Sequence, residues 1–320
     1  MTGDLQRLHH VGLVVDDMEQ ALALFRRLGF NCPTPACPMM SEQEGEPPRP
    51  LGAANTYASF TDNFIEIVAV MEDESRIPPD VKRVPLQAPA PVLSRIVATA
   101  KRLVATLKAC LARFQGLHIL VFTTRDVEQS RQRFDSIGVG HSGTNTVQRP
   151  VETPAGSKMV PVRYLEIDKE PVPEGRLAIA ENPASEVLNA QRHADHPNGA
   201  VDLVESILCV ADAELDDFDR RYQRYLDREP RRVGAARVFD LERSARVTIV
   251  PASALGEFLP GELPAALPAF VAYTVAVRDL GVARAELESN GLPIVSTAQG
   301  DIFVPAAAAM GAAVVFRQQR

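Results

Sequence analysis

The sequence predicts an α+β fold in which four strand–helix–strands (βαβββ) modules pair into two curved-sheet domains. One unit, made of an apolar strand, an aspartate at the turn and an amphipathic helix, occurs four times along the 320 residues. Short strand-like runs follow each copy. A single module of this kind leaves one face of its sheet unburied, so we expect the modules to pair within residues 1–197 and 198–320.

The recurring unit is defined by its aspartate and by a glycine that closes three of its four helices. The copies are VGLVVDDMEQALALFRRLGF with Asp17, LVFTTRDVEQSRQRFDSIGV with Asp126, SILCVADAELDDFDRRYQRYL with Asp212 and TVAVRDLGVARAELESNGLP with Asp279. An aspartate at this position caps a helix by accepting hydrogen bonds from its free backbone N–H groups. The glycine, which the Asp212 copy lacks, supplies the left-handed residue that ends the helix.

The runs that follow the helices have the length and composition of strands. In chain order they are NTYASFT and NFIEIVAV, VRYLEI and RLAIAE, ARVFDL and ARVTIV, DIFVP and AAVVFR. Each module therefore has one strand before its helix and further strands after it.

An insertion separates the first two modules. Its first half is rich in proline, and its second half, near residues 91–114, carries Ile96, Leu103, Leu107 and Leu111 on one helical face with basic residues around it. A basic amphipathic helix is also found at membranes and on partner proteins. In an acidic protein with one such helix, we expect a connector packed on its own chain.

The amino-acid composition and net charge limit the class of protein to which the chain can belong. The chain is 46% hydrophobic and 23% charged, values typical of a soluble globular protein. Its net charge of -7 argues against nucleic-acid binding, and no apolar run is long enough to span a bilayer. The four cysteines form no CxxC pair, so we expect buried thiols and a cytoplasmic location.

Five stretches resemble the vicinal oxygen chelate superfamily, and within it the glyoxalase-like group. They are HHVGLVVDDMEQALALFRRLGF, GAANTYASFTDNFIEIVAV, RPVETPAG, HADHPNGAVDLVESILCVAD and GAAVVFR. The resemblance implies the paired-module fold and a small-molecule substrate or ligand. It does not choose a reaction, because the superfamily contains lyases, isomerases, dioxygenases, epoxide-opening resistance enzymes and metal-free drug-binding proteins.

The resemblance also implies a metal site in the mouth of a curved sheet. A histidine on the first strand and a glutamate on the last strand hold the metal in enzymes of the superfamily. Here these are His10, seven residues before Asp17, and Glu66 within NFIEIVAV, while alternation turns His9 to the other face. His118 is a third ligand only if a bulge turns it to the pocket.

Four further residues are candidates for chemistry or ligand contact. Glu181, near the end of the second module, is a second candidate catalytic carboxylate beside Glu66. Arg149 in QRPVETPAG has the charge to bind an anionic ligand group. His196 in the junction between the halves and Glu205, seven residues before Asp212, are candidate substrate contacts. His193 lies beside His196 in the same junction.

Two functional hypotheses follow and stay open at this point. In the first, one divalent metal (Zn, Ni, Fe, Mn or Mg) at His10 and Glu66 supports lyase or isomerase chemistry through an enolate. In the second, the chain binds or sequesters a small organic molecule without metal, as resistance proteins of this fold do. A structural protein with vestigial pockets is a third reading. The partners we expect are a small molecule and no nucleic acid or membrane, with a homodimer left open.

Overall fold

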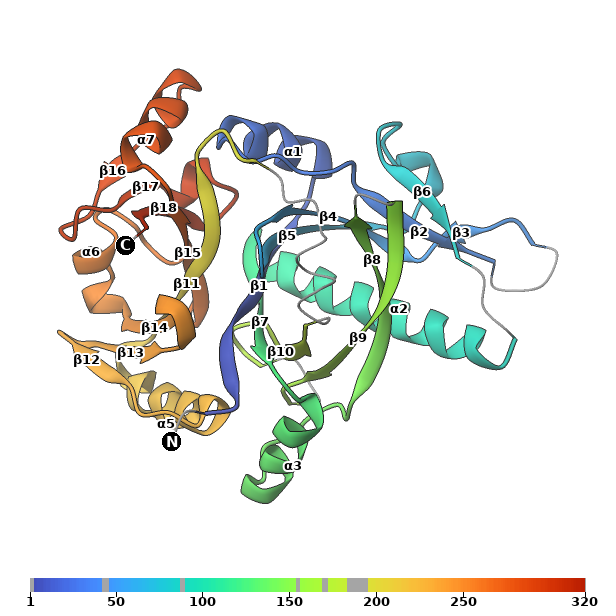
Figure 1. Cartoon of the computed structure of the whole chain (residues 1–320), viewed down its shortest axis with the longest axis horizontal. Coiled ribbons are helices and arrows are strands. Elements are labelled where there is room, and N and C mark those ends of the chain that lie inside the picture. Colours follow the sequence, from blue (N-terminus) through green and yellow to red (C-terminus); the bar gives the residue numbers. More distant parts are fainter. Residues whose placement is uncertain are drawn as a thin grey trace.

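The computed structural model consists of two curved β-sheets that lie side by side, one from each half of the chain (Figure 1). It describes residues 3–41, 46–86, 90–153, 156–168, 172–182 and 195–319. The order of helices and strands confirms the predicted α+β fold with its repeated strand–helix–strands modules.

In the first sheet, β1 and β7 form the central antiparallel pair, and β5 and β10 flank them as parallel neighbours. The strand order is β6–β2–β4–β5–β1–β7–β10–β9–β8, with the short β3 beside β2. The strands are β1 (Leu5–Val15), β2 (Ala36–Met40), β3 (Arg49–Pro50), β4 (Gly52–Ser59), β5 (Phe64–Met71), β6 (Lys82–Pro85), β7 (Gly116–Thr124), β8 (Asn145–Thr153), β9 (Gly156–Glu166) and β10 (Arg176–Glu181).

The second sheet repeats this arrangement around the antiparallel pair β11 and β15. Its order is β12–β13–β14–β11–β15–β18–β17–β16, with β14 and β18 as the parallel neighbours of the central pair. The strands are β11 (Ala200–Val210), β12 (Arg231–Val233), β13 (Ala236–Asp240), β14 (Arg246–Pro251), β15 (Ala269–Val277), β16 (Val295–Ser296), β17 (Ile302–Val304) and β18 (Ala313–Gln318). Among the described residues, one bridge, between Leu117 and Phe270, joins the two sheets.

The helices begin where the repeated aspartates predict them. The carboxylates of Asp17, Asp126 and Asp279 each accept two backbone N–H bonds at the start of α1, α3 and α7. Gly138 ends α3 in the left-handed conformation, with φ 65. The helices are α1 (Met18–Arg27), α2 (Ala90–Arg113), α3 (Val127–Ile137), α5 (Leu215–Leu226), α6 (Leu255–Phe258) and α7 (Leu280–Ser289), with short 3₁₀ helices at Glu74–Arg76, Asp212–Glu214, Glu242–Ser244, Ala252–Ala254 and Ala306–Ala308.

The Asp212 copy of the unit departs from the others at its cap. Asp212 begins a 3₁₀ turn, and α5 starts three residues later, at Leu215, without a side-chain cap. The carboxylate of Asp212 instead accepts from the backbone N–H of Ser253 at 3.0 Å. The helix follows its aspartate as predicted, but the aspartate binds a loop rather than the helix.

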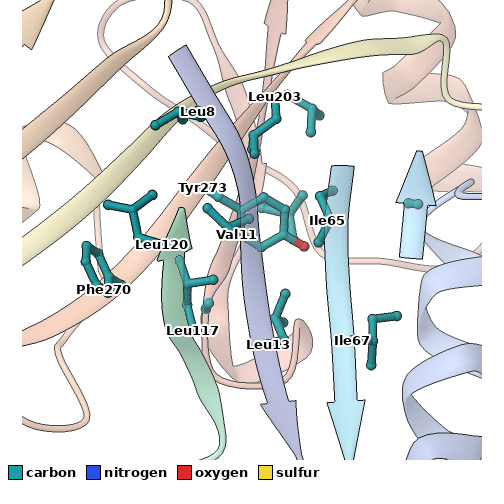
Figure 2. Packing of buried hydrophobic residues seen from close by; sticks show 14 of the residues in the cluster. Leu8, Val11, Leu13, Ile65, Ile67, Leu117, Leu120, Leu203, Phe270 and Tyr273 are labelled. Carbon is teal, nitrogen blue, oxygen red and sulfur yellow. The ribbon is translucent and has the colours of Figure 1, made fainter. Parts of the chain in front are cut away.

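The two halves share one hydrophobic core. Figure 2 shows side chains of the first sheet meeting residues of β11 and β15 from the second sheet. The labelled members are Leu8, Val11, Leu13, Ile65, Ile67, Leu117, Leu120, Leu203, Phe270 and Tyr273, all of them buried. Because this cluster extends from one sheet to the other, it fixes their relative position.

The connector helix α2 packs on the first sheet, on the face opposite to α1 and α3. Leu107 and Cys110 of α2 lie in a separate buried cluster with strand residues, namely Val14, Val68, Ile119, Val121, Val162, Ala178 and Ala180. Gly52 of β4 shows how close the contact is, because a Cβ there would lie 2.4 Å from Cγ2 of Val104. The sheet curls around α2 in Figure 1, so its concave face is filled by the chain itself.

The cysteines are free thiols and most of them are buried, as the sequence predicts. All four thiols are free, and those of Cys37, Cys110 and Cys209 are buried, while Cys32 is half-buried. In the described part of the chain, no helix is long and apolar enough to cross a membrane.

Candidate functional site

His10 and Glu66 lie on one face of the first sheet, as the resemblance implied. β1 and β5 are parallel neighbours, and the register pairs Gly12 with Glu66. The His10 Nε2 atom is 3.8 Å from Oε2 of Glu66, and both side chains are half-buried. The His10 ring stacks on Phe64, with centroids 4.5 Å apart, and Asn55 Nδ2 donates to Glu66 Oε1 at 2.9 Å.

The prediction that His9 points away from His10 is wrong. The register between β1 and β7 shifts between Leu8 and His10, which makes His9 the extra residue of a bulge. The two Nδ1 atoms are 2.7 Å apart, so one ring donates to the other. Strict alternation fails here because a bulge rotates the strand by one residue.

His118 lies on a second bulge but makes other contacts. Its Nε2 donates to the carbonyl oxygen of Phe114 at 2.8 Å, and its ring packs on the Phe114 ring. The side chain is fully buried, and burial is the largest cause of a pKa below the ordinary histidine value.

The donor set around His10 does not fit a resident divalent metal. Catalytic metal sites usually take about three protein ligands. Among the residues that the structure describes, no group of three or more His, Cys, Asp or Glu side chains is placed to hold a metal ion. Within the described residues, His10 and Glu66 therefore do not belong to a three-donor group placed to hold a metal ion.

Glu181, also predicted from the first half, makes other contacts. Glu181 accepts from the backbone N–H of Val127 at 3.1 Å and from Arg163 at 3.2 Å, so it caps the start of α3. Arg149 lies in β8 opposite Val160, and its side chain is outside the described part, as is the whole of His193.

His196 joins the junction segment to the first half. Its Nδ1 accepts from the backbone N–H of Asn31 and its Nε2 donates to the Ser59 carbonyl, both at 3.1 Å. Phe30 and Phe60 pack edge-on against the ring. Burial, the largest cause, lowers the pKa of His196, and these two bonds use both nitrogens of the neutral ring.

Glu205 is the centre of a buried polar cluster on the second sheet. It lies on β11 between Arg246 of β14 and Thr274 of β15, and it is 3% exposed. Oε1 of Glu205 accepts from Thr248 at 2.6 Å and lies 2.8 Å from Arg246 Nε. Oε2 accepts from Arg246 Nη2 at 2.9 Å and Thr274 at 3.2 Å, and it lies 2.9 Å from Arg317 Nη1.

These contacts hold Glu205 in its charged form. Burial by itself would raise the pKa of the carboxyl group, but the charges of Arg317 and Arg246 and the hydrogen bonds outweigh it. The pKa therefore lies below the ordinary glutamate value. A carboxylate with every oxygen engaged is suited to holding arginines in place rather than to carrying a proton.

A cavity of about 120 Å³ opens beside this cluster. Its polar lining residues are Glu205, Arg231, Arg246, Asp301, Arg317, Gln299 and three threonines. Its other walls are apolar, from Ile207, Val233, Val238, Phe258, Leu259 and Val315.

A larger groove of about 970 Å³ lies next to the cavity, at the boundary between the two halves. The groove and the cavity share Arg246, Gln299, Asp301 and Arg317 as lining residues. Neither of these two spaces is lined by His10 or Glu66.

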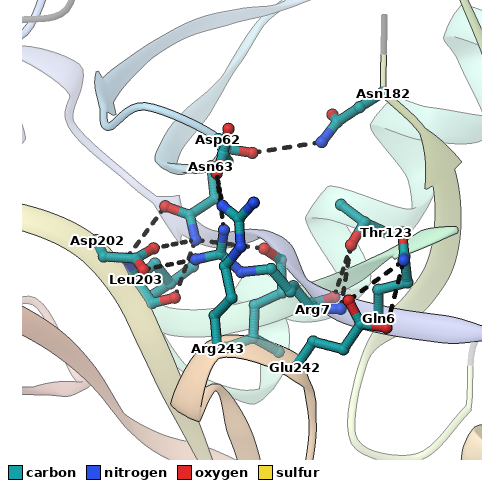
Figure 3. A network of polar contacts seen from close by, with 11 residues as sticks. Gln6, Arg7, Asp62, Asn63, Thr123, Asn182, Asp202, Leu203, Glu242 and Arg243 are labelled. Carbon is teal, nitrogen blue, oxygen red and sulfur yellow. Dashed lines mark hydrogen bonds and ion pairs between the residues drawn. The ribbon is translucent and has the colours of Figure 1, made fainter. Parts of the chain in front are cut away.

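Part of the groove lining belongs to a network of ion pairs from both halves, which Figure 3 shows. Arg7 of β1 binds Asp62 at 2.8 Å and Asp202 at 2.5 Å, and Arg243 also reaches Asp62 at 2.7 Å. Asn63 donates to Asp202 at 2.7 Å and to the Leu203 carbonyl at 2.9 Å.

The sequence analysis found Glu205 but missed Arg246 and Arg317. Arg246 precedes Thr248 by two residues on β14, Arg317 follows Val315 by two residues on β18, and both Thr248 and Val315 line the cavity. Residues two apart on a strand share a face, so alternation could have found both.

Comparison with known proteins agrees with this architecture. The sequence profile of a family described as glyoxalase-like domain matches residues 8–226. A search of curated protein sequences finds no match.

Solved structures match almost the whole chain. One is a hypothetical protein from Staphylococcus aureus, with 11% identity, 98% of this chain and 99% of that chain covered, and a TM-score of 0.58. Another is a mutant of 4-hydroxymandelate synthase from Streptomyces coelicolor, with 12% identity, coverage of 98% and 93%, and a TM-score of 0.56. A third is the Mn(II)-bound glyoxalase from Novosphingobium aromaticivorans, with 10% identity, coverage of 99% and 83%, and a TM-score of 0.53.

At these identities the likeness to solved structures shows the fold alone, which is that of the vicinal oxygen chelate superfamily. The profile match extends over more than half of the chain. This chain therefore belongs to the glyoxalase-like domain family.

Proposed function

We propose that the chain binds a small organic molecule, without a metal, in the cavity of its second sheet. The observation that carries the proposal is the contrast between the two concave faces. On the first sheet, α2 fills the face with Leu107 and Cys110, whereas the second sheet keeps a cavity of about 120 Å³. An apolar cavity with a few convergent polar groups is the usual form of a ligand site.

The experiment uses protein purified without an affinity tag and dialysed against EDTA. Four probes, benzoate, isovalerate, benzyl alcohol and isoamyl alcohol, are titrated and followed by amide chemical shifts. We expect at least one probe to shift residues of β11, β14, β15 and β18. Val315→Phe, which fills the cavity, should abolish these shifts, whereas the same change at exposed Val282 on α7 should not.

Two results would contradict the proposal. One is that none of the four probes shifts these strands. The other is that probe binding appears only when Mn²⁺ or Zn²⁺ is added back to the protein.

A second candidate function is lyase or isomerase chemistry at the first sheet. The 3.8 Å approach of His10 Nε2 to Glu66 Oε2 favours it, because such a pair can move a proton. Elemental analysis separates the two functions. Near-stoichiometric divalent metal in untagged protein that is lost in His10→Ala would support this second function, whereas metal-free protein whose second sheet binds a probe would support the first.

A further inference from the structure

We propose that the ligand of the second-sheet cavity is a small organic carboxylate whose acidic group binds Arg246 and whose apolar group fills the cavity. This inference rests on the proposed function and adds the chemical class of the ligand. It follows from the hydrogen-bonding state of the charged groups that line the cavity.

Glu205 is not available to the ligand. Thr248 and Thr274 donate their hydroxyl groups to it, and Arg246 and Arg317 contact both of its oxygens. A carboxylate only accepts hydrogen bonds, so these donors leave little room for another. Glu205 instead holds the guanidinium groups of Arg246 and Arg317 in the lining of the cavity.

Arg246 is the donor that this arrangement leaves open. Its Nε and Nη2 face Glu205, and its Nη1 makes no hydrogen bond or ion pair with any described residue. The side chain is 30% exposed and lines both the cavity and the groove. A guanidinium held by one carboxylate presents its remaining N–H groups in a fixed geometry, which suits an incoming carboxylate.

Arg317 is more fully used than Arg246. Its Nη1 contacts Glu205 at 2.9 Å, while its Nε and Nη2 contact Asp301 at 2.8 and 2.7 Å. The cavity lining has three arginines and two carboxylates, and Asp240, which pairs with Arg231, stands outside it. Counted with Asp240, the three arginines are balanced by three carboxylates, so the preference for an anionic ligand rests on the open Nη1 donor of Arg246 and not on net charge.

The volume limits the apolar part of the ligand. An engineered apolar cavity of about 150 Å³ holds benzene. The cavity here, about 120 Å³, therefore accepts a branched alkyl group or a small ring. Because Arg246 and Arg317 also line the groove of about 970 Å³, any larger substituent has to extend from the acidic end into that groove.

The test compares matched probes in wild type and in Arg246→Lys. Benzoate is paired with benzyl alcohol and isovalerate with isoamyl alcohol, so each pair keeps the apolar group and changes only the charge. Lysine keeps a positive charge beside Glu205, which protects folding, but it lacks the planar fork. The matched control is Arg284→Lys on α7, an exposed arginine paired with Glu288.

In the wild type we expect each carboxylate to bind about 10-fold more tightly than its alcohol at about pH 7. Arg246→Lys should remove most of that preference by weakening carboxylate binding, with the dissociation constants of the alcohols unchanged. Arg284→Lys should leave all four constants unchanged. Should Arg246→Lys fail to fold, raising NaCl from about 50 mM to about 500 mM should weaken carboxylate binding in the wild type and spare the alcohols.

Equal affinity for carboxylates and alcohols would overturn the inference but leave the proposed function standing. So would a carboxylate preference that Arg246→Lys leaves intact. If no probe binds the second sheet at all, the proposed function fails together with the inference.

Discussion

Glu205 and Arg317 meet at 2.9 Å although their strands, β11 and β18, are separated in the sheet by β15. Thr274 of the intervening strand donates to the same carboxylate oxygen at 3.2 Å. With Arg246 and Thr248 of β14, the cluster therefore ties four neighbouring strands together on the cavity side of the second sheet.

Replacing Glu205 with Gln should strongly destabilise the protein. The change removes the negative charge opposite Arg246 and Arg317, which leaves Arg246 without its carboxylate and Arg317 with Asp301 alone. We expect the free energy of unfolding to fall by about 3–5 kcal/mol in urea denaturation. Asp217→Asn, which breaks an exposed pair with Arg220, is the control and should cost about 0–1 kcal/mol. A loss at Glu205 no larger than the control would contradict this account.

Arg7 and Arg243 offer a matched test of burial, because both bind Oδ2 of Asp62 at nearly equal distances. The Arg7 side chain is 9% exposed and the Arg243 side chain is 71% exposed. Arg7→Met also leaves Asp202 without its cation, and we expect it to lower the free energy of unfolding by about 3–5 kcal/mol. Arg243→Met should cost about 0–1 kcal/mol. Similar losses in the two variants would show that burial does not set the strength of these pairs.

Stability should fall as the pH drops below about 6.5, the ordinary pKa of histidine. Burial lowers the pKa of His118 and His196 in the folded chain. Below pH 6.5 the unfolded chain therefore binds protons that the folded chain does not, whereas above it both states are neutral. Each histidine then lowers the free energy of unfolding by at most about 1.4 kcal/mol per pH unit.

Urea denaturation measures how the free energy of unfolding changes with pH. The pH values are about 7.5, 6.5 and 5.5, which bracket the ordinary pKa of histidine. His196→Gln cannot titrate in this range, so its slope should be smaller than that of the wild type. An unchanged slope in the variant would rule out His196 as a source of the pH dependence.

If α2 packs on the first sheet, truncating a buried apolar residue of the helix should cost more stability than truncating an exposed one. Leu107 is 1% exposed among strand residues, whereas Val92 is 38% exposed. Leu107→Ala should cost about 2–5 kcal/mol in thermal or urea unfolding, because it leaves a cavity under the helix. Val92→Ala should cost less than about 0.5 kcal/mol. A small effect at Leu107 would mean that α2 leaves the sheet in solution.

Much of the fold was determined by local sequence. The caps at Asp17, Asp126 and Asp279 form because an aspartate needs only the backbone of its own helix to accept from. His10 and Glu66 came together because the repeat fixes which strands are neighbours and alternation fixes the face. Glu205 lies seven residues before Asp212, as His10 lies seven residues before Asp17, so the repeat predicted its position as well.

Only the tertiary structure decided which of the two concave sheet faces keeps an open cavity. Periodicity tells which face of a strand a residue lies on, but not which distant element covers that face. The amphipathic pattern predicted α2, yet only the packing of Leu107 shows that the helix fills the concave side of the first sheet. The bulges at His9 and His118 depend on strand register, which one strand's sequence does not encode. Arg246 and Arg317 acquire their role only where three strands bring them to one buried carboxylate.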